Sequence, residues 1–407
     1  MNKAREKLGL HCDVISGYAF KSIDWQEYGI PVIKIGNISN GSDVILDEQT
    51  QYVANDFYDS LDEKYHIEKG DVLISLTGSH INQPNSMVGR CCRNYSENKY
   101  LLNQRAGKVI PFDNTDKGYL YYLLSTNAVK YDIANRAYGG ANQVNVSPKD
   151  IKNIKWCFPD LPTQKRIADV LSAYDDLIEN NNKRIALLEK SAQELYKEWF
   201  VRRKKDDWEL VKLSQFGYSL ESGSRPKGGV DGSLQDGYPS LGAEAIGKLG
   251  EFDYSATKLI PEDFYKKMKR GLGEDKDILL YKDGAYIGKV TLFMDEFPYK
   301  DYAINEHVFL MRSNEPLYQY YLYFTLALPQ YFTQMQNLNR NAAQPGLTGK
   351  DIDILKLYQP DKDTITKFNS IVEPMLHNIF SLAKQNQNLI KQRDFLLPRL
   401  MSGKLEV

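Results

Sequence analysis

Basic, amide and aromatic side chains occur in short Gly- and Ser-rich segments at several places in this 407-residue chain. Two such segments, Ser16–Ser22 and Ser222–Gly229, lie early in the two halves of the sequence. Two more, Thr77–His80 and Lys282–Lys289, each follow an apolar run typical of a β-strand. Gly-rich backbone can approach phosphate, and Arg, Lys, Asn and Gln can reach base edges. Taken singly, each segment fits a plain surface turn better than a binding loop, and nucleic-acid binding is the functional alternative.

A third pair of segments, Arg136–Gln143 and Asn339–Gln344, occupies matching positions late in the two halves. Recurrence at matched positions favours a shared role over chance. From the three kinds of segment we predict nucleic-acid contacts by Tyr18, Lys21, Thr77, Ser79, Arg136, Tyr138, Asn142, Gln143, Ser224, Arg225, Lys227, Tyr286, Lys289, Arg340, Asn341 and Gln344.

Motifs for catalysis are missing from the sequence. It has no GxxxxGK[ST] phosphate loop, no GxGxxG after a strand, and no HExxH or GxSxG motif. Asn82–Asn85 does not fit the Asn- or Asp-Pro-Pro-aromatic run of an amino-methyltransferase. Glu274–Lys276 and Pro360–Lys362 resemble nuclease carboxylate–lysine patterns, but such triplets are common in solvated loops and helix starts. We therefore expect a protein that is not an enzyme.

Composition excludes several classes of protein. The 52 basic and 53 acidic residues nearly balance, so the net charge gives no general attraction to nucleic acid or membrane. The four cysteines form no CxxC, and the five histidines have no zinc-ligand spacing, so we expect reduced thiols and no metal site. No signal peptide and no apolar run of membrane-spanning length occurs. The sequence predicts a soluble, cytoplasmic protein without contact to a membrane.

The two halves share a pattern of elements. Pro31–Ile35 and Asp71–Leu76 are predicted strands, and Tyr119–Ile133 has helical spacing of its apolar residues. In the second half, Asp277–Tyr281 is a predicted strand and Tyr320–Tyr323 enters a helical stretch. Tyrosines at spacing i, i+3 in both helical stretches are expected to lie in the core.

The chain contains an internal repeat, and matched residues in the later parts of the two halves are 201 positions apart. Lys149–Ile151 recurs as Lys350–Ile352, and Pro159-Asp160 recurs as Pro360-Asp361. Each half then ends in a ladder of mostly apolar residues in which Asn181, Asn386 and Arg393 are the polar interruptions. The first ladder is Ile167, Leu171, Tyr174, Ile178, Asn181, Ile185, Leu188, Ala192, Leu195 and Trp199. The second is Phe368, Val372, Met375, Ile379, Leu382, Asn386, Leu389, Arg393, Leu396 and Leu400.

Alternating steps of three and four residues in the first ladder indicate a coiled coil. A helix from Gln164 to Arg202 would be about 58 Å long, which is too long for packing on one small domain. Because only Arg203–Asp207 separates this helix from the second globule, a second helix that pairs with the first within one chain must run antiparallel to it. Polar residues in such a seam often fix its register. Pro374 and Pro398 are expected to kink the second helix or remove hydrogen bonds from it.

The predicted fold class is therefore α+β, with two mixed α/β domains separated by a long antiparallel two-helix coiled coil and related by a pseudo-two-fold repeat. The predicted boundaries are 1–160 for the first domain, 161–205 for the central helix, 206–361 for the second domain, and 362–407 for the C-terminal helix.

This layout resembles the specificity (S) subunit of type I restriction-modification systems over the whole chain. The sharpest match is the helix entry Leu161–Ala168, and the domain openings Ser16–Phe20 and Glu221–Lys227 are similar to the family as well. Asp150-Ile151 and its repeat before the second helix fit the same pattern. The second helix entry departs from it, because Asp361–Thr364 lacks the Leu-Pro of the first.

The resemblance implies a host-defence protein in which each domain reads one half of a bipartite double-stranded DNA target. The helices would set the spacer and dock two methyltransferase subunits, and restriction subunits with translocase activity would join them. S-adenosylmethionine, ATP and Mg would be bound by these partners, with no cofactor in this chain. The helix residues expected to dock the subunits are Arg166, Tyr174, Ile178, Ile185, Leu188, Leu195, Met375, Ile379, Leu389 and Leu396.

Two alternatives stay open at this point. A coiled-coil scaffold or adaptor whose globules bind proteins explains the helices equally well, but it explains the paired basic loops poorly. A system that only methylates would have the same kind of specificity subunit, and the sequence does not separate it from a restriction system.

Overall fold

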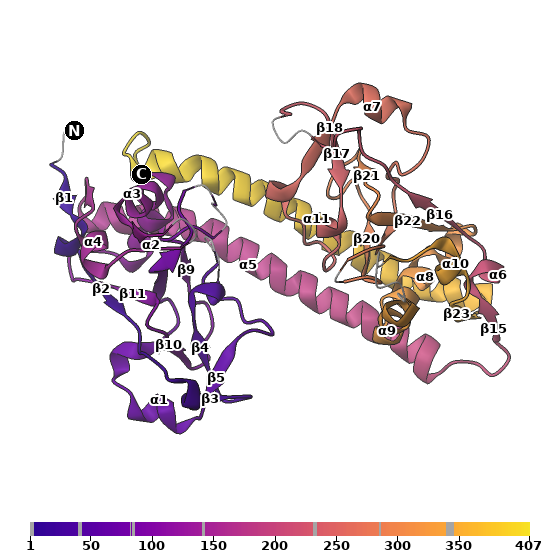
Figure 1. Cartoon of the computed structure of the whole chain (residues 1–407), viewed down its shortest axis with the longest axis horizontal. Coiled ribbons are helices and arrows are strands. Elements are labelled where there is room, and N and C mark those ends of the chain that lie inside the picture. The colour runs from indigo at the N-terminus through magenta and orange to yellow at the C-terminus, as the bar shows by residue number, and fades with distance from the viewer. Residues whose placement is uncertain are drawn as a thin grey trace. The chain divides into compact units, whose positions relative to one another are not determined.

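The chain folds into two compact units that share the two long helices (Figure 1). Unit 1 comprises Met1–Leu177 and Leu389–Val407, and unit 2 comprises Ile178–Asn388. The computed structural model describes residues 4–39, 43–81, 83, 86–140, 143–230, 234–284, 286–338 and 346–407. Among these residues no helix is both long and apolar enough to cross a membrane. The long helices are α5 (Leu161–Lys197), which continues as a π-helical turn over Glu198–Arg202, and α11 (Lys362–Met401).

Unit 1 is built around a four-stranded antiparallel sheet with strand order β2-β11-β7-β9. A second, five-stranded sheet has the order β3-β5-β4-β10-β6, in which β4 and β10 are parallel. Two small sheets pair β1 with β14, and β12 with β13 and β8. The helices of the unit, besides its parts of α5 and α11, are α1 (Asp56–Ser60), α2 (Lys117–Ser125), α3 (Asn127–Arg136) and α4 (Pro148–Lys152). The strands are β1 (Glu6–Lys7), β2 (Cys12–Ser16), β3 (Trp25–Gln26), β4 (Ile30–Ile33), β5 (Gln51–Val53), β6 (His66–Ile67), β7 (Val72–Ser75), β8 (Thr77–Gly78), β9 (Cys91–Arg93), β10 (Tyr100–Leu102), β11 (Ala106–Pro111), β12 (Tyr138–Gly139), β13 (Val144–Asn145) and β14 (Lys155–Trp156).

Unit 2 repeats this topology. Its central sheet has the order β16-β22-β19-β20, a parallel pair joins β17 to β21, and β15 pairs with β23 as β1 does with β14. The helices are α6 (Leu213–Phe216), α7 (Glu262–Lys267), α8 (Gln319–Leu326), α9 (Pro329–Leu338) and α10 (Gly349–Asp353). The strands are β15 (Glu209–Lys212), β16 (Tyr218–Ser222), β17 (Tyr238–Leu241), β18 (Lys258–Ile260), β19 (Asp277–Tyr281), β20 (Val290–Phe293), β21 (Ala303–Ile304), β22 (Val308–Ser313) and β23 (Lys356–Gln359).

The predicted strands and core tyrosines are confirmed. β4, β7 and β19 lie where the apolar runs predict strands, and Tyr119, Tyr122, Tyr320 and Tyr323 are all buried. The prediction of a single helical stretch over Tyr119–Ile133 is wrong in one respect, because this segment forms two helices, α2 and α3. Thr126 is extended between them, and its hydroxyl accepts a hydrogen bond from the backbone N–H of Val129, which begins a new helix.

The matched motif Lys149–Ile151 and Lys350–Ile352 lies in the short helices α4 and α10. In α4 the Ser147 hydroxyl and the Asp150 carboxylate form a capping box with the backbone. Thr348 and Asp351 form the same box in α10. The repeated aspartate therefore caps a helix, and the isoleucine after it is buried in both units.

The matched Pro-Asp pairs begin the long helices. Asp160 accepts a hydrogen bond from the backbone N–H of Thr163 at 2.9 Å, and Asp361 accepts one from Thr364 at the same distance. An aspartate at this position satisfies N–H groups that have no partner within the helix. Asp361 also pairs with Lys205 at 2.7 Å, and this hydrogen bond holds the pKa of the carboxyl well below its usual range.

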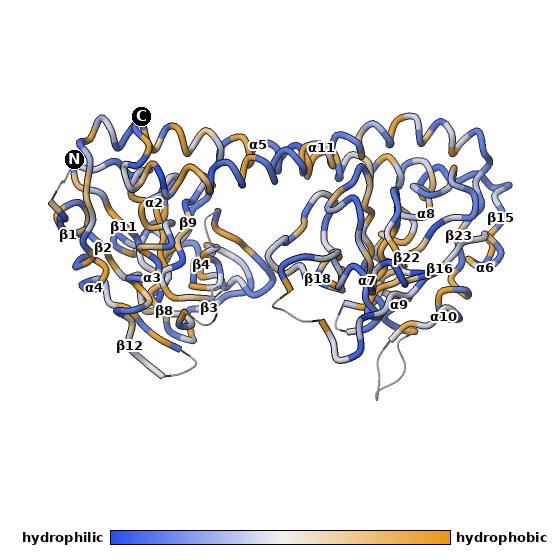
Figure 2. The backbone as a smooth tube through the Cα atoms, turned by 90° about the horizontal axis from the view of Figure 1, so that it is seen from above, coloured by the Kyte–Doolittle hydropathy of each residue, from blue (hydrophilic) through white to orange (hydrophobic). Residues whose placement is uncertain are grey.

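In unit 2, α5 and α11 run antiparallel and bury the predicted ladders against each other. Ile185, Ala192, Phe368, Val372 and Ile379 all lie in the core of this unit. Figure 2 shows the alternation of apolar and polar residues along both helices. The two seam asparagines meet: the Asn181 amide donates to the Asn386 side-chain oxygen at 2.9 Å, and Asn386 donates to Asn182 at 2.8 Å. A shifted register would leave these buried amides without partners, so the pair fixes the register of the seam.

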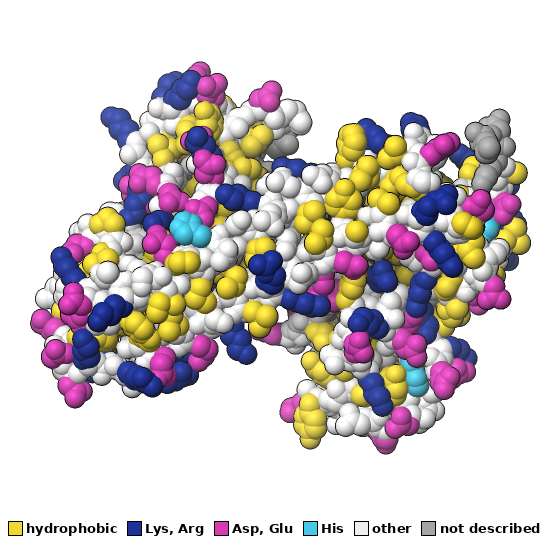
Figure 3. Space-filling model, turned by 180° about the vertical axis from the view of Figure 1, so that it is seen from behind, with side chains coloured by type: hydrophobic (Ala, Val, Ile, Leu, Met, Phe, Trp, Pro, Cys, Tyr) yellow, Lys and Arg dark blue, Asp and Glu magenta, His cyan; other side chains and the backbone are white. Residues whose placement is uncertain are grey.

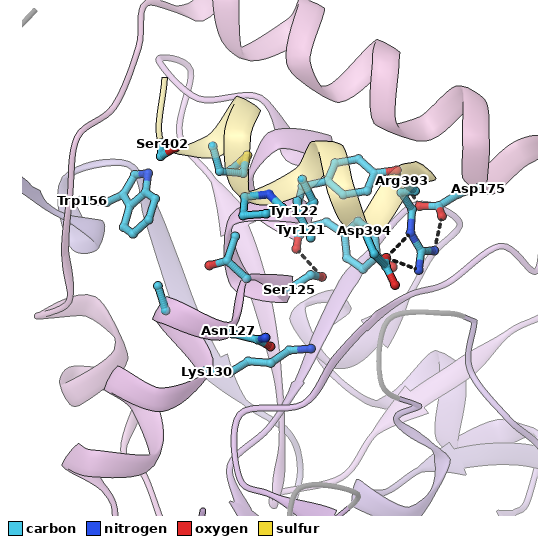
Figure 4. A pocket seen from close by; sticks show the side chains of 15 residues that line it. Tyr121, Tyr122, Ser125, Asn127, Lys130, Trp156, Asp175, Arg393, Asp394 and Ser402 are labelled. Carbon is cyan, nitrogen blue, oxygen red and sulfur yellow. Dashed lines mark hydrogen bonds and ion pairs between the residues drawn. The ribbon is translucent and has the colours of Figure 1, made fainter. Parts of the chain in front are cut away.

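In unit 1, the third polar interruption of the ladders, Arg393, forms a buried ion pair with Asp175 of α5 at 2.6 Å (Figure 4). The Tyr122 hydroxyl of α2 donates to the other carboxylate oxygen of Asp175 at 2.6 Å. Burial and the nearby Asp175 raise the pKa of Tyr122 well above its usual range, so the phenol keeps its proton. Three elements of the unit therefore meet at one carboxylate.

The helix α11 is continuous through Pro374 and Pro398. Both side chains are exposed, so the proline rings lie on the outer face of the helix. Each proline lacks the N–H that would donate to the preceding turn. The predicted loss of a hydrogen bond therefore does not interrupt the helix.

Candidate nucleic-acid interface

Three of the loop segments of unit 1 meet at one end of its central sheet. The backbone N–H of Tyr18 donates to Leu102 at 2.8 Å, and Gln104 donates back to Tyr18 at 2.9 Å. The backbone N–H of Leu76, at the end of β7, donates to Arg105 at 3.0 Å. β13 adds to this end through its pairing with β8. Figure 2 shows β12 on the side of unit 1 opposite to α5.

The predicted contact residues of unit 1 divide into exposed and buried ones. Lys21, Tyr138 and Gln143 are exposed, and Tyr18 is half-buried. Thr77 and Ser79 are buried: the Thr77 hydroxyl donates to Asn145 at 2.8 Å, and that of Ser79 donates to the Gln83 carbonyl at 2.7 Å. Hydroxyls engaged in this way hold the loops rather than face a ligand. Arg136 is paired with Asp132 at 2.8 Å, and Asn142 lies outside the described residues.

The same end of the sheet in unit 2 repeats the backbone hydrogen bonds. The N–H of Lys282 donates to His307 at 3.0 Å, as that of Leu76 does to Arg105. Leu347 donates to Lys282 at 2.8 Å, as Val146 donates to Leu76 at 2.9 Å. These bonds place the loop after β19 beside the turn before β22, and they give both units the same frame for different loop residues.

A glycine begins the first loop in both units. A Cβ at Gly17 would overlap the carbonyl oxygens of Leu102 and Asn103, and a Cβ at Gly223 would overlap that of Ile304. The backbone of each loop therefore passes directly against the turn between the two sheets, where only glycine fits. This contact fixes where the residues that follow, up to Lys21 and Lys227, leave the sheet.

In unit 2, Arg225 lies in a network of charged side chains. Its guanidinium pairs with Glu306, and its Nη2 is 2.5 Å from Nε2 of His307. Nδ1 of His307 is 2.5 Å from the Asp283 carboxylate. Burial alone would raise the pKa of Glu306, but the hydrogen bond and charge of Arg225 outweigh it, so this pKa lies below its ordinary value. The hydrogen bond to Glu306 also raises the pKa of Arg225.

The remaining predicted residues of unit 2 are exposed where the structure describes them. Ser224 and Lys227 follow Gly223, and Tyr286 is 55% exposed. The Lys289 ammonium lies 3.9 Å from the centre of the Tyr286 ring, a cation–π contact at the surface. Arg340, Asn341 and Gln344 lie outside the described residues.

The predicted docking residues are mostly part of the seam. Ile185 and Ile379 are buried in the core of unit 2, so they hold the two helices together and offer no surface to another chain. The ladder residues that are partly buried and pack on a core are Leu188, Leu195, Met375 and Leu396, and those that are half-buried elsewhere on the helices are Tyr174, Ile178 and Leu389. Arg166 is exposed, and its guanidinium donates to the Val407 carbonyl at 3.1 Å.

Apolar residues outside the ladders face outward on both helices. The largest exposed fractions on α5 are 51% for Leu177 and 64% for Leu187, and Val201 in the π-helical turn after α5 is 49% exposed; on α11, Ile371 is 45% and Phe395 58% exposed. Sequence reasoning missed them because it followed the seam. The apolar residues that lie between the ladder positions in the sequence could have indicated this outward-facing apolar surface.

Charged side chains, histidines and cysteines are spread over the described part of the chain. Figure 3 shows basic and acidic side chains interspersed over the face that it presents. Within the described ranges no group of three or more His, Cys, Asp and Glu side chains could hold a metal ion. Cys12, Cys91 and Cys92 are buried free thiols, and burial raises the pKa of Cys12 to about 12.

Known proteins are similar to this chain in sequence and in fold. The family model for the type I restriction modification DNA specificity domain matches residues 7–190. The type I restriction enzyme MjaIX specificity subunit of Methanocaldococcus jannaschii is 28% identical over 333 residues, which are 77% of this chain and 74% of that protein. The putative MjaX specificity subunit of the same organism is 25% identical over 405 residues, 93% of this chain and 88% of that protein. A crystal structure of a type I S subunit from M. genitalium has a TM-score of 0.60 at 16% identity, covering 98% of this chain and 96% of that one.

The repeated domain with its paired loops, together with the DNA specificity model matched by the first repeat, defines a DNA specificity protein. The chain belongs to the specificity (S) subunits of type I restriction-modification systems. As such it is a non-catalytic component of a type I restriction-modification complex. This membership favours DNA specificity over the scaffold alternative.

Proposed function

We propose that each domain reads one half of a bipartite double-stranded DNA target, and that α5 and α11 set the spacer between the halves. The observation that carries this proposal is the repeat of one sheet order in both units, with different side chains on equivalent loops. Two copies of one frame with different loops suit two different half-sites. We also propose that the chain divides into a first domain, a central helix, a second domain and a C-terminal helix, with the boundaries 1–160, 161–205, 206–361 and 362–407.

The contact surface that we propose is the loop-bearing end of each central sheet. Its exposed members in unit 1 are Lys21, Tyr138 and Gln143, beside the half-buried Tyr18 and the paired Arg136. Those in unit 2 are Ser224, Arg225, Lys227, Tyr286 and Lys289. Thr77 and Ser79 are assigned to holding the loops, and Asn142, Arg340, Asn341 and Gln344 stay predictions from the sequence.

Two methyltransferase subunits and, in a restricting system, restriction and translocase subunits are the proposed protein partners. Outward apolar residues such as Leu177, Leu187 and Phe395 suit a permanent protein interface better than the seam residues do, because exposed apolar surface gains most from burial. The partners would bind S-adenosylmethionine, ATP and Mg, and the complex would act in the cytoplasm.

Duplex binding by this chain together with its methyltransferase subunits tests the proposal. Selection from a random duplex pool should enrich a split motif, bound about 1,000-fold or more tightly than unrelated duplex. The affinity should fall as salt rises, because Lys and Arg contacts to phosphate release counterions. Equal binding of all duplexes at every salt concentration would favour the scaffold instead.

A further inference from the structure

We propose that Lys267, Lys269 and Arg270 contact phosphate groups of the DNA at the half-site of unit 2, and that unit 1 makes no equivalent contact. The inference rests on the proposed function, since it names the part of the DNA that this surface of one domain binds. It starts from the basic segment Lys266–Arg270, which comprises the end of α7 and the turn after it and has four basic side chains in five residues.

Most charges of the basic segment have no partner in the protein. Lys266 is the exception, because its ammonium pairs with Glu262 one turn earlier at 2.6 Å. Lys267, Lys269 and Arg270 are all exposed, and their side chains form no ion pair or hydrogen bond with the described residues. A basic residue in the last turn of a helix suits its dipole, but Lys269 and Arg270 lie beyond α7. Their charges are therefore available to a ligand.

The basic segment lies beside the first loop of unit 2, Ser222–Gly229. Gly271 follows Arg270 directly, and a Cβ on Gly271 would lie 2.7 Å from the Cα atom of Gly223. The N–H of Gly271 donates to the Glu221 carboxylate at 2.6 Å, which fixes this approach. Consecutive Cα atoms are about 3.8 Å apart, so the backbone of Arg270 lies next to the contact. The basic segment therefore extends the surface that we propose for DNA contact.

The helix that carries the basic segment is held in place on unit 2. The ring of Tyr265 in α7 stacks on that of Tyr238 in β17, with 3.8 Å between the ring centres and 4° between the planes. The backbone N–H of Tyr265 donates to the Pro261 carbonyl at 3.0 Å. Figure 2 shows α7 and β18 apart from both long helices. A fixed basic surface at this place suits DNA better than a subunit docked on the helices.

Unit 1 has the opposite charge at the equivalent place. Asp56–Tyr58 in α1 has the same sequence as Asp263–Tyr265 in α7, and each helix follows a matched strand, β5 or β18. Unit 1 then continues with Asp59–Tyr65, which has three acidic residues and one lysine. This Lys64 is paired with Asp62 at 3.0 Å. The shared fold therefore does not require the basic side chains, and acidic ones would repel phosphate.

Phosphate is the target that these side chains fit. Lys and Arg side chains neutralise DNA phosphates and position a protein on the duplex without reading its sequence. The 52 basic and 53 acidic residues of the chain nearly balance, so attraction to DNA has to come from local groups of unpaired cations. An acidic protein surface is the other partner that three cations suit. The position beside the first loop favours DNA.

The test measures how the DNA affinity of the chain with its methyltransferase subunits depends on salt. Lys267→Gln, Lys269→Gln and Arg270→Gln are made singly and together. The slope of log affinity against log salt should become shallower by about 1 in each single variant and about 3 in the triple variant, because fewer counterions are released. The selected motif should stay that of wild type. Lys248→Gln, which removes another exposed charge of unit 2, is the control and should keep the wild-type slope.

Ethylation of DNA phosphates locates the contact. Ethyl groups on phosphates at one half-site should weaken binding of the wild-type complex, because they remove the negative charge that the cations need. The triple variant should be insensitive to ethylation at those same phosphates. Phosphates at the other half-site should behave alike in both complexes.

The outcomes separate the inference from the proposed function. A wild-type complex that selects no split motif would overturn the proposed function itself. A split motif with the wild-type salt slope kept in the triple variant would overturn the phosphate contact alone. If that variant also bound fewer methyltransferase subunits, the basic segment would be a contact to an acidic protein surface. A motif that the triple variant relaxes at particular bases would mean base reading and would equally overturn the inference.

Discussion

Replacing Arg393 with methionine is expected to destabilise unit 1 by about 3–5 kcal/mol, because the Asp175 carboxyl group would be left in a buried site without its cationic partner. Asp175 is 8% exposed, and its other partner, the Tyr122 hydroxyl, is neutral. Figure 4 shows this pair at the wall of a cavity of about 450 Å³. Urea denaturation measures the loss, and hydrogen exchange of α2 localises it to unit 1.

Two comparisons make this result specific. The double variant Asp175→Leu with Arg393→Met should recover most of the stability, since a buried ion pair can be replaced by apolar side chains at little net cost. Lys69→Met, which breaks an exposed ion pair with Glu97 in the same unit, should change stability by no more than about 0.5 kcal/mol. A loss below about 1 kcal/mol for Arg393→Met would show that the pair is not the link we describe.

Replacing Gly223 with alanine is the second change with a large expected effect, about 3 kcal/mol of destabilisation and a displaced Arg225 loop. The added Cβ would overlap the Ile304 carbonyl oxygen, and backbone cannot move aside as a flexible side chain can. Because this loop starts at the turn that holds Glu306, the preference for one half of the DNA target should also fall. Thermal denaturation and the methylated motif are the two measurements.

Gly247→Ala is the matched control in the same unit. A Cβ at Gly247 would meet nothing within 4 Å, so stability and motif should both be kept. Equal behaviour of the two alanine variants would contradict the close contact at Gly223. Gly17→Ala should behave like Gly223→Ala, with its effect on the other half of the motif.

Features that depend on local spacing could be predicted from the sequence. The ladders predict the seam because a 3.5-residue period places their apolar side chains on one stripe, and this stripe is buried in unit 2. The polar interruptions Asn181 and Asn386 predict a fixed register, and their side chains form a hydrogen bond with each other. The repeat of Lys149–Ile151 indicates equivalent positions, but only the structure gives its role, the capping boxes of α4 and α10.

Features that depend on contacts between distant segments could not be predicted. Nothing near Arg225 in the sequence indicates that its partners are Glu306 and His307, about 80 residues later. In the same way, no local pattern shows that Thr77 is turned inward to Asn145. Periodicity shows which residues share a face, but which ladder residues stay open to a partner depends on the packing of the whole unit.

Sequencing of methylated bases in cells that express the neighbouring methyltransferase subunit, with and without this chain, tests whether the chain directs methylation to a DNA sequence. We expect methylated adenines at one split motif, present only when this chain is expressed. Methylation that is unchanged by removal of the chain would contradict it.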